Sequence, residues 1–236
     1  MNNSPAFVLP TLLLAVAALA AGSVSALDGV FKDVVVSGRV DYTKLTGDRL
    51  AAVNAYIDGF VDLGAPAQPL ADYINLYNAV MLKAVVEKRA ASPTWKPSDN
   101  DFGVFKEPRV PLKGGMKSLN DLENEIIRKQ YKEPRIHAAL NCAALSCPPL
   151  IPRAYYTETL EIQLEANMKA FVNDPVRNVF DDKAKTMKLS RIFDWFAADF
   201  GGKDKLPDYL AKYRPGDYNG WKIEYQQYDW TLNEAK

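Results

Sequence analysis

The only histidine of the chain and both of its cysteines lie within eleven residues of one another, in the segment PRIHAALNCAALSCPPL. In chain order these residues are His137, Cys142 and Cys147. A cysteine thiolate can attack an acyl carbon, an imidazole within hydrogen-bond reach can take the thiol proton, and a carboxylate can orient the imidazole. The cluster therefore predicts a thiol-dependent hydrolase or acyltransferase with Cys142 as its nucleophile and His137 as its base.

The backbone between the two residues limits this hypothesis. Residues 135–141 have the apolar character of a buried strand. Five residues of extended strand span about 16 Å, and side chains five positions apart point to opposite faces. His137 and Cys142 can therefore meet only if the chain turns sharply near Asn141.

The same cysteines allow a second interpretation. Four residues separate Cys142 from Cys147, and a disulfide can close a loop of that size. The chain-entropy model gives such a small ring about 2 kcal/mol of stabilisation. The protein would then be a non-catalytic binding or scaffold domain with a Cys142–Cys147 disulfide. A redox pair fits less well, because thioredoxin-like sites have two residues between the cysteines. His137 would be a buried core residue that donates to a carbonyl.

Three polar residues on predicted helices complete the candidate site. Glu123 either orients His137 or lies on a solvated helix face. Asn75 and Asn78 interrupt the most apolar predicted helix, and amides on such a helix need hydrogen-bond partners. They either hold the backbone of neighbouring loops or line a pocket.

The elements that must position these residues can be read from hydrophobic periodicity and turn signals. Residues 30–40 suit a strand or an extended arm, 92–115 an irregular loop, and 221–228 a last strand. Ser118 and Asp121 have the spacing of a helix cap. Helices are predicted over residues 47–63, 70–89, 118–131, 157–172, 192–200 and 207–213, and a hairpin over 176–180 and 186–189. Together they predict a helix-rich single α+β domain packed on a small, mostly antiparallel sheet.

Composition excludes several kinds of function. The 29 basic residues balance 29 acidic ones, so the chain has no formal net charge. A neutral chain lacks a broad electrostatic grip on nucleic acid or on an anionic membrane. One histidine excludes zinc sites that need two or three imidazoles, and no glycine-rich nucleotide motif occurs. We expect no metal and no cofactor, and the sequence names neither a partner nor an oligomeric state.

The first 26 residues have the pattern of a targeting signal. They carry no charged side chain, and an apolar run from Ala6 to Ala21 precedes the sequence Val-Ser-Ala. Small residues of this kind mark a signal-peptidase site, which predicts cleavage after Ala26. Residues 27–236 would then be exported to the periplasm or secreted, without a stable membrane anchor, into a compartment where cysteines can pair. The alternative is an uncleaved anchor, although the apolar run is short for a membrane span.

Five sequence blocks occur in an order that is similar to a known family. They are YINLYNAVML, SLNDLENEIIR, the cysteine segment, KLSRIFDWFAADFG and YDWTLN. Over about residues 40–233 the chain resembles the bacterial branch of the domain of unknown function 547.

This resemblance carries its own implications for the site. The family blocks map onto Asn75, Asn78, Glu123, His137, Cys142, Cys147 and Asp229 with Trp230. Many relatives have a histidine after the glutamate of the helix block, where this chain has Asn124. The resemblance thus implies a Cys142, His137 and Glu123 site that is analogous to papain-like or transglutaminase-like thiol hydrolases. It also implies that Asn75, Asn78, Cys147 and Asp229 contact the substrate.

Overall fold

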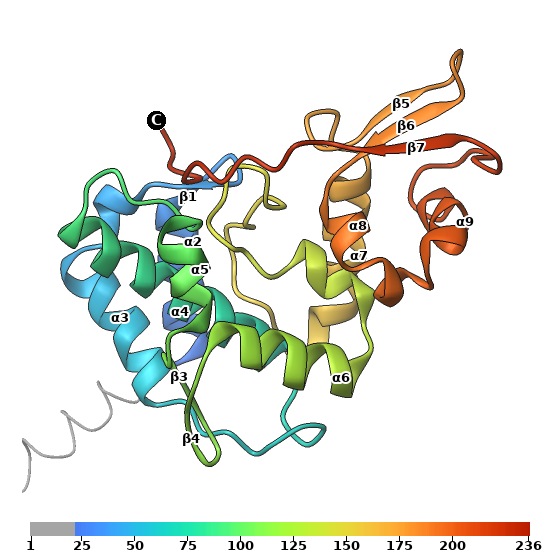
Figure 1. Cartoon of the computed structure of the whole chain (residues 1–236). Helices are drawn as coiled ribbons and strands as arrows, with labels where there is room; N and C mark the ends of the chain where they lie inside the picture. The colour runs from blue at the N-terminus through green and yellow to red at the C-terminus, as the bar shows by residue number, and fades with distance from the viewer. Residues whose placement is uncertain (1–21) are drawn as a thin grey trace, which may run out of the picture.

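Two groups of elements, each around its own hydrophobic cluster, make up the protein. The computed structural model describes residues 22–236, so most of the predicted signal segment lies outside the described residues. The first group contains α2 to α6, and the second contains α7 to α9 and the three-stranded sheet. In Figure 1, α2 to α5 stand at the left, α6 lies below α7, and the sheet extends to the upper right. The described residues are rich in helix and carry small sheets, which confirms the predicted α+β class.

The first group begins with helix α2, Val24–Val34, where a strand or arm was predicted. Its first turn is capped by the Ser23 hydroxyl, which accepts a hydrogen bond from the Ala26 N–H. The prediction is wrong for residues 30–34, because Leu27, Val30, Phe31 and Val34 are buried at helical spacing. Only the short antiparallel pair β1 (Val35–Val36) and β2 (Arg39–Val40) is extended, and the 3-10 helix η1 (Tyr42–Lys44) follows it.

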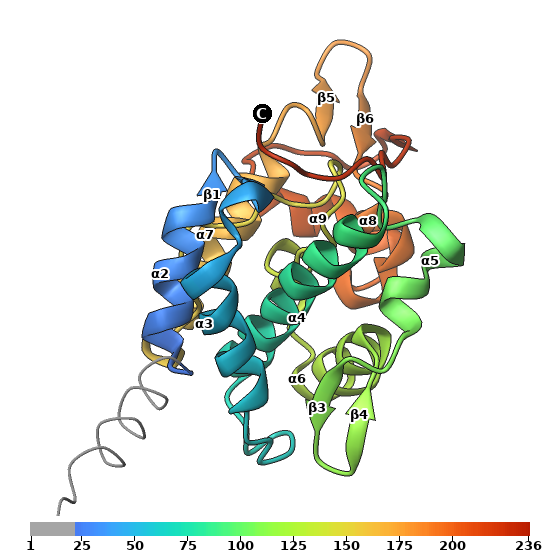
Figure 2. The ribbon, with the colours of Figure 1, turned by 90° about the vertical axis from the view of Figure 1, so that its left-hand side faces the viewer.

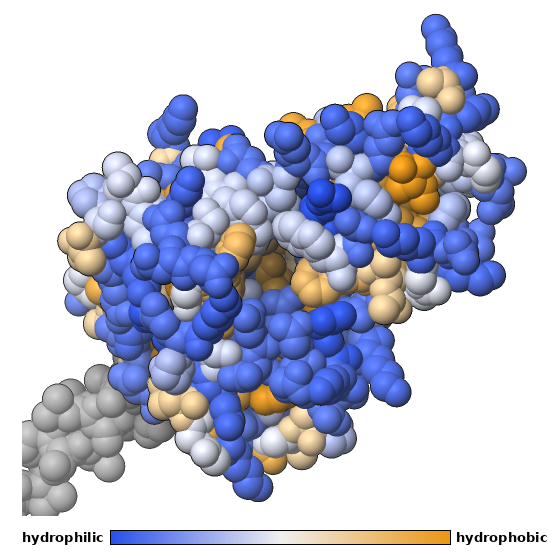
Figure 3. All heavy atoms as spheres, viewed as in Figure 1, coloured by the Kyte–Doolittle hydropathy of each residue, from blue (hydrophilic) through white to orange (hydrophobic). Residues whose placement is uncertain are grey.

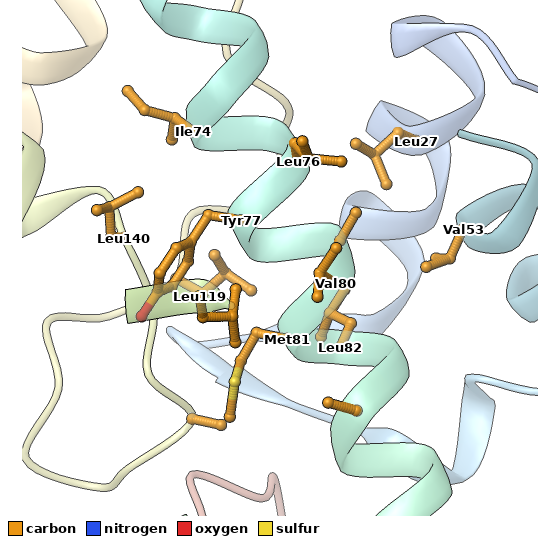
Figure 4. Close-up of a cluster of buried hydrophobic side chains, with 14 of the residues drawn as sticks. Leu27, Val53, Ile74, Leu76, Tyr77, Val80, Met81, Leu82, Leu119 and Leu140 are labelled. Carbon is orange, nitrogen blue, oxygen red and sulfur yellow. The ribbon is translucent and has the colours of Figure 1, made fainter. Parts of the chain in front are cut away.

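Helix α4, Leu70–Ala91, is the centre of this group, as the sequence predicts. Figure 2 shows it crossing diagonally, with α2 and α3 (Gly47–Asp58) on one side and α5 on the other. In Figure 4, Leu76 points toward Leu27 of α2, whereas Tyr77 points the other way toward Leu140. A helix that is buried on nearly all sides can be apolar around its circumference.

The predicted loop over 92–115 is partly ordered into regular elements. It holds α5 (Asp99–Lys106) and the antiparallel strands β3 (Val110–Leu112) and β4 (Gly115–Lys117). Residues Asn100 to Phe102 have left-handed backbone angles, with φ values of 52°, 52° and 59°. Consecutive left-handed residues other than glycine are rare, so sequence periodicity did not reveal this segment.

The next helix carries the predicted cap. The Ser118 N–H donates to the Asp121 carboxylate at 2.9 Å, and the Asp121 N–H donates to the Ser118 hydroxyl at 3.0 Å. The turns after the cap are π-helical over η2 (Asp121–Ile127) and continue as α6 (Arg128–Tyr131). Wider π-helical turns are frequent at functional sites.

The histidine segment is the main correction to the predicted elements. Residues Pro134–Ala138 form the 3-10 helix η3 and not a buried strand. Pro134 occupies the first turn, where a missing N–H costs nothing, and the Glu133 carboxylate accepts the Arg135 N–H. The prediction of burial was correct, because Ile136 and His137 are both buried. Turn chemistry at the start of the segment decided its backbone.

The second group largely follows the prediction. Its helices are η4 (Thr157–Thr159), α7 (Leu160–Val172), α8 (Ile192–Trp195), η5 (Ala197–Phe200), η6 (Lys203–Lys205) and α9 (Leu206–Ala211). Strand β6 (Thr186–Leu189) pairs antiparallel with β5 (Val179–Asp181), as expected for the predicted hairpin, and parallel with β7 (Lys222–Tyr225). This last pair is the exception in a mostly antiparallel set.

The C-terminal segment 226–236 joins the two groups, as the red chain in Figure 1 shows. It lies between strand β2 and the loop that carries both cysteines, residues 141–147, which we call the Cys loop. The Leu145 N–H donates to the Thr231 carbonyl at 2.7 Å, and the Val40 N–H donates to the Asn233 carbonyl at 3.0 Å. Within residues 22–236, no helix is both long and apolar enough to cross a bilayer.

Candidate functional site

A cavity of about 380 Å³ opens between the two groups, next to the Cys loop. Figure 3 shows the hollow near the centre of that face, with apolar side chains in and around it. Its wall is mostly apolar, and four predicted site residues contribute to it: Glu123, His137, Cys142 and Cys147. The remaining lining residues are Tyr77, Phe102, Phe105, Lys106, Asn120, Leu140, Ile192, Trp195, Phe196, Tyr228 and Trp230.

Cys142 enters the cavity because the chain turns after η3, as the hypothesis required. The turn is made at Ala143, whose φ is 59°, and it is fixed by the Asn141 side chain, which accepts the Ala143 N–H at 3.0 Å. The Cys142 sulfur lies 3.2 Å from the Tyr228 hydroxyl. Burial raises the pKa of Tyr228 well above its ordinary value, so this phenol keeps its proton and is able to donate it to the Cys142 sulfur once the thiol ionises.

The two thiols differ in acidity. Burial alone would raise the pKa of the Cys142 thiol, but hydrogen bonds with Cys147 and Tyr228 outweigh it, and the pKa is lowered. The pKa of Cys147 is raised well above its ordinary value, chiefly by burial. The structure holds both cysteines as free thiols. Cys142 is therefore the thiol that ionises first.

Cys147 supports its neighbour more than it faces the cavity. It is only 3% exposed. Its sulfur accepts the Cys142 N–H at 3.0 Å and donates to the Leu140 carbonyl at 3.7 Å. Only a small part of the Cys147 side chain therefore reaches the cavity wall, where a substrate contact was predicted.

His137 is buried, and both of its ring nitrogens face carboxyl groups. Nε2 lies 2.7 Å from Oδ2 of Asp199, and Nδ1 lies 3.9 Å from Oε1 of Glu123. The ring stacks on Phe196 with centroids 4.0 Å apart. Of the hydrogen bonds among the described residues, none joins His137 to a sulfur. The structure thus places the imidazole in the cavity wall but not in the predicted direct bond with Cys142.

Asp199, in η5, is the site residue that sequence reasoning missed. Arg128 holds its carboxylate through two bonds, from Nε at 2.6 Å and from Nη2 at 2.9 Å. Burial opposes ionisation of Asp199, but the hydrogen bonds from His137 and Arg128 outweigh it and hold the pKa of this carboxyl far below its ordinary value. An ionised carboxylate only accepts hydrogen bonds, so Nε2 of His137 carries the proton that joins them.

The pKa of the Glu123 carboxyl is shifted in the opposite direction to that of Asp199. Burial raises the pKa of the Glu123 carboxyl, while the charges of His137 and Arg128 partly offset that effect. The distance of 3.9 Å to Nδ1 of His137 is too long for a direct hydrogen bond, and one bridging water or a small rotation would connect them. Asp199 therefore has the orienting contact that the sequence hypothesis gave to Glu123, and Glu123 lies in the cavity wall with a raised carboxyl pKa.

Asn75 and Asn78 do not line the cavity and instead hold loop backbone. Asn75 donates to the Tyr155 carbonyl at 2.7 Å and accepts the Tyr155 N–H at 2.8 Å. Asn78 donates to the Ala139 carbonyl at 3.0 Å and accepts the Asn141 N–H at 2.9 Å. Because each amide bonds to backbone inside the core, the structure supports the loop-anchoring alternative for both residues.

Asp229 also lies outside the cavity, although its neighbours Tyr228 and Trp230 line it. Its exposed carboxylate accepts the Thr231 N–H at 2.8 Å, and its N–H donates to the Ser146 hydroxyl at 2.9 Å. Asp229 lines a smaller neighbouring pocket instead, and it fixes the C-terminal segment against the Cys loop.

One comparison with known proteins gives a match. Residues 63–172 fit the family model described as "Protein of unknown function, DUF547". No curated protein and no solved structure gives a significant match. The matched region contains Glu123, His137 and both cysteines, whereas Asp199 and Tyr228 lie beyond it. Through residues 63–172, which carry the Cys loop and η3, the chain is similar to the family of proteins of unknown function DUF547.

Proposed function

We propose that this protein is a thiol-dependent hydrolase or acyltransferase with Cys142 as its nucleophile. The observation that carries the proposal is the free Cys142 thiol in the cavity wall, with a lowered pKa and a hydrogen bond to Tyr228. The thiolate is the reactive form of cysteine, and a thiol ionises near neutral pH only when its surroundings stabilise the anion.

The cavity offers a set of groups for an acyl transfer. The Cys142 sulfur would attack the carbonyl carbon of a bound ester or thioester, and the bond to the leaving group would break as the acyl-cysteine forms. The Glu123 carboxyl, whose pKa burial raises, would donate one proton to the leaving group as the general acid. The Glu123 carboxylate would then take the proton of water or of a second acceptor as it attacks the acyl-cysteine, so that the thiolate leaves and the carboxyl group is restored. Asp199 would orient the imidazole.

Selective alkylation tests the nucleophile. Under native conditions and in the presence of reductant, iodoacetamide should label one cysteine quickly. The labelling rate should rise with pH around the pKa of that thiol, which lies at a lower pH than the pKa of an ordinary thiol. Cys142→Ser should abolish the fast reaction, whereas Cys147→Ser should retain it, because the Cys147 thiol has a raised pKa. Mass spectrometry of the intact protein gives both stoichiometry and site.

Two further outcomes decide the matter. A wild-type protein that gains the mass of an acyl group from a p-nitrophenyl ester, where Cys142→Ser gains none, would support the acyl-enzyme. Fast labelling that persists in Cys142→Ser, or equal slow labelling of both thiols, would contradict the proposal.

A non-catalytic binding or scaffold domain is the second candidate, and one contact favours it. The Cys147 sulfur accepts the Cys142 N–H at 3.0 Å, so the two side chains lie close enough to pair in an oxidising compartment. Protein isolated from its compartment without reductant would then contain no free thiol, and no acyl-enzyme would form after mild reduction.

We also propose that the chain is a bacterial exported protein whose signal segment is removed after Ala26. The support is the uncharged, apolar sequence of residues 1–26. The cleavage position falls in the first turn of α2, directly before the fully buried Leu27. Intact mass measurement of protein recovered from the periplasm or the medium should give a chain that begins at Leu27. A full-length mass there would contradict the assignment.

A further inference from the structure

We propose that the cavity takes an uncharged apolar acyl chain of medium length, presented as a neutral ester or thioester and not as a free acid. This inference deepens the proposed function and rests on it for the chemistry at Cys142. The class of ligand that the cavity binds can be measured without that chemistry.

The first argument is the aromatic wall, which we define as Phe102, Phe105, Trp195, Tyr228 and Trp230. These rings come from α5, α8 and the C-terminal segment and pack on one another across the cavity. The Tyr228 and Trp230 centroids are 4.5 Å apart, and those of Phe102 and Trp230 are 4.8 Å apart. Trp195 packs on Tyr228, with centroids 4.8 Å apart, and is 48% exposed. An apolar ligand gains free energy in such a place because it removes apolar surface of both partners from water.

The second argument is size. A cavity of about 380 Å³ holds on the order of ten groups of water size, since each takes about 30 Å³ in the liquid. A methylene group is of comparable size. The space therefore suits an acyl chain of about eight to ten carbons, with its carbonyl at the Cys142 end.

The third argument is charge. Among the described residues that line the cavity, Lys106 is the one lysine or arginine, and its half-exposed ammonium already pairs with Asp101 at 2.6 Å. The His137 imidazole is already bonded to Asp199. Arg128 behind the cavity is engaged by two oxygens of Asp199. The Glu123 carboxyl lies in the wall. A buried carboxylate needs a paired cation, and the carboxylate of a bound free acid would find no unpaired cation here. Hydrolysis of a bound ester would therefore favour release of the acid product.

Ligand binding to the full-length Cys142→Ser protein tests the inference. The probes are primary amides of straight-chain acids with 4, 6, 8, 10 and 12 carbons, and the matching carboxylates. Trp195 and Trp230 provide the fluorescence signal, which Trp→Phe variants at these positions would assign. We expect the dissociation constant of the amides to fall about threefold to fourfold per methylene up to about ten carbons and then to level off. Each carboxylate should bind at least about tenfold more weakly than its amide.

Matched variants separate the cavity from unspecific adsorption. Phe102→Ala should weaken the ten-carbon amide about tenfold or more and should flatten the dependence on chain length. Phe180→Ala removes a ring that packs on Tyr218, away from the cavity, and should change neither. Affinity that does not depend on chain length, or carboxylates that bind more tightly than amides, would overturn the inference. If the amides behave as expected but wild-type protein forms no acyl-cysteine, the ligand class stands and the proposed chemistry fails.

Discussion

Replacing Asn141 with alanine is expected to lower the free energy of unfolding by about 3–5 kcal/mol. The Asn141 side chain donates to the Pro148 carbonyl at 2.9 Å and accepts from the Ala143 N–H at 3.0 Å and from the Asn233 amide at 3.1 Å. Alanine would leave these three buried partners without their hydrogen bonds. Each orphaned buried group costs about 1–3 kcal/mol, and partial access of water would reduce the sum.

Urea unfolding of the full-length protein measures this effect, with Asn219→Ala as the control. Asn219 is exposed, and its amide bonds only to the neighbouring Asp217, so we expect a change within about 0.5 kcal/mol. Because Asn141 joins the Cys loop to the C-terminal segment, the alanine variant should also lose the fast alkylation of Cys142. A loss of stability below about 1 kcal/mol would show that the Cys loop is held by other contacts.

Arg177 is the other residue that fixes the Cys loop, from the side of the second group. Its guanidinium donates to the Cys147 carbonyl at 2.8 Å and to the Leu145 carbonyl at 3.0 Å, and it pairs with Asp174. Both groups of elements therefore contribute to the position of one loop. This explains why a site with a free thiol can be built on backbone that is neither helix nor strand.

The elements that the sequence predicts well are those whose packing follows one period. Helix α7 buries residues at helical spacing, and the β5–β6 hairpin has its turn residues between two apolar runs. Helix α4 is predictable for another reason, because its apolar run is too long for a strand. Residues 135–141 are predicted as a strand because the run is short and mostly apolar, whereas the 3-10 helix η3 covers Pro134–Ala138. Such a run has no period that separates a strand from a tight helix, and the hydrogen bond from the Arg135 N–H to Glu133 decides the matter.

The site is predictable only where its parts are close in sequence. His137 and Cys142 are five residues apart, and both do line one cavity. The group that bonds the imidazole, Asp199, is 62 residues further along, and the phenol at the sulfur, Tyr228, is 86 residues from Cys142. Their positions depend on how α8, η5 and the C-terminal segment pack, which no local pattern specifies. Two carboxylates, Asp194 and Asp199, stand among the aromatic residues of 192–200, and no local pattern says which of them meets the imidazole.

Replacing Asp199 with asparagine is expected to lower the free energy of unfolding by about 2–3 kcal/mol at neutral pH. Asparagine keeps the shape but removes the charge that Arg128 and His137 bond. Loss of one partner from a fully buried pair costs about 3–5 kcal/mol, and the smaller value here reflects side chains of Asp199 and Arg128 that are 24% and 25% exposed.

The pH dependence of this effect has a defined sign. The pKa of Asp199 is far below its ordinary value of 3.8 in the folded protein, so the ionised carboxylate stabilises the fold. That contribution is complete above the ordinary pKa and is lost only as the pH falls toward the folded value. The difference between wild type and Asp199→Asn should therefore be constant from pH 7 to about pH 4 and should shrink in more acidic solution.

Asp194→Asn is the matched control, because Asp194 precedes Asp199 by five residues and is 22% exposed. Its partners Arg191 and Lys203 are 42% and 63% exposed, and such surface pairs contribute at most about 1 kcal/mol. The chain has one histidine, so a single set of imidazole NMR signals reports on His137 directly. We expect the Nε2–H proton, which is sheltered by its bond to Asp199, to be observed in wild type and in Asp194→Asn and to be lost in Asp199→Asn. Equal destabilisation by the two variants, with an unchanged His137 signal, would show that Asp199 does not position the imidazole.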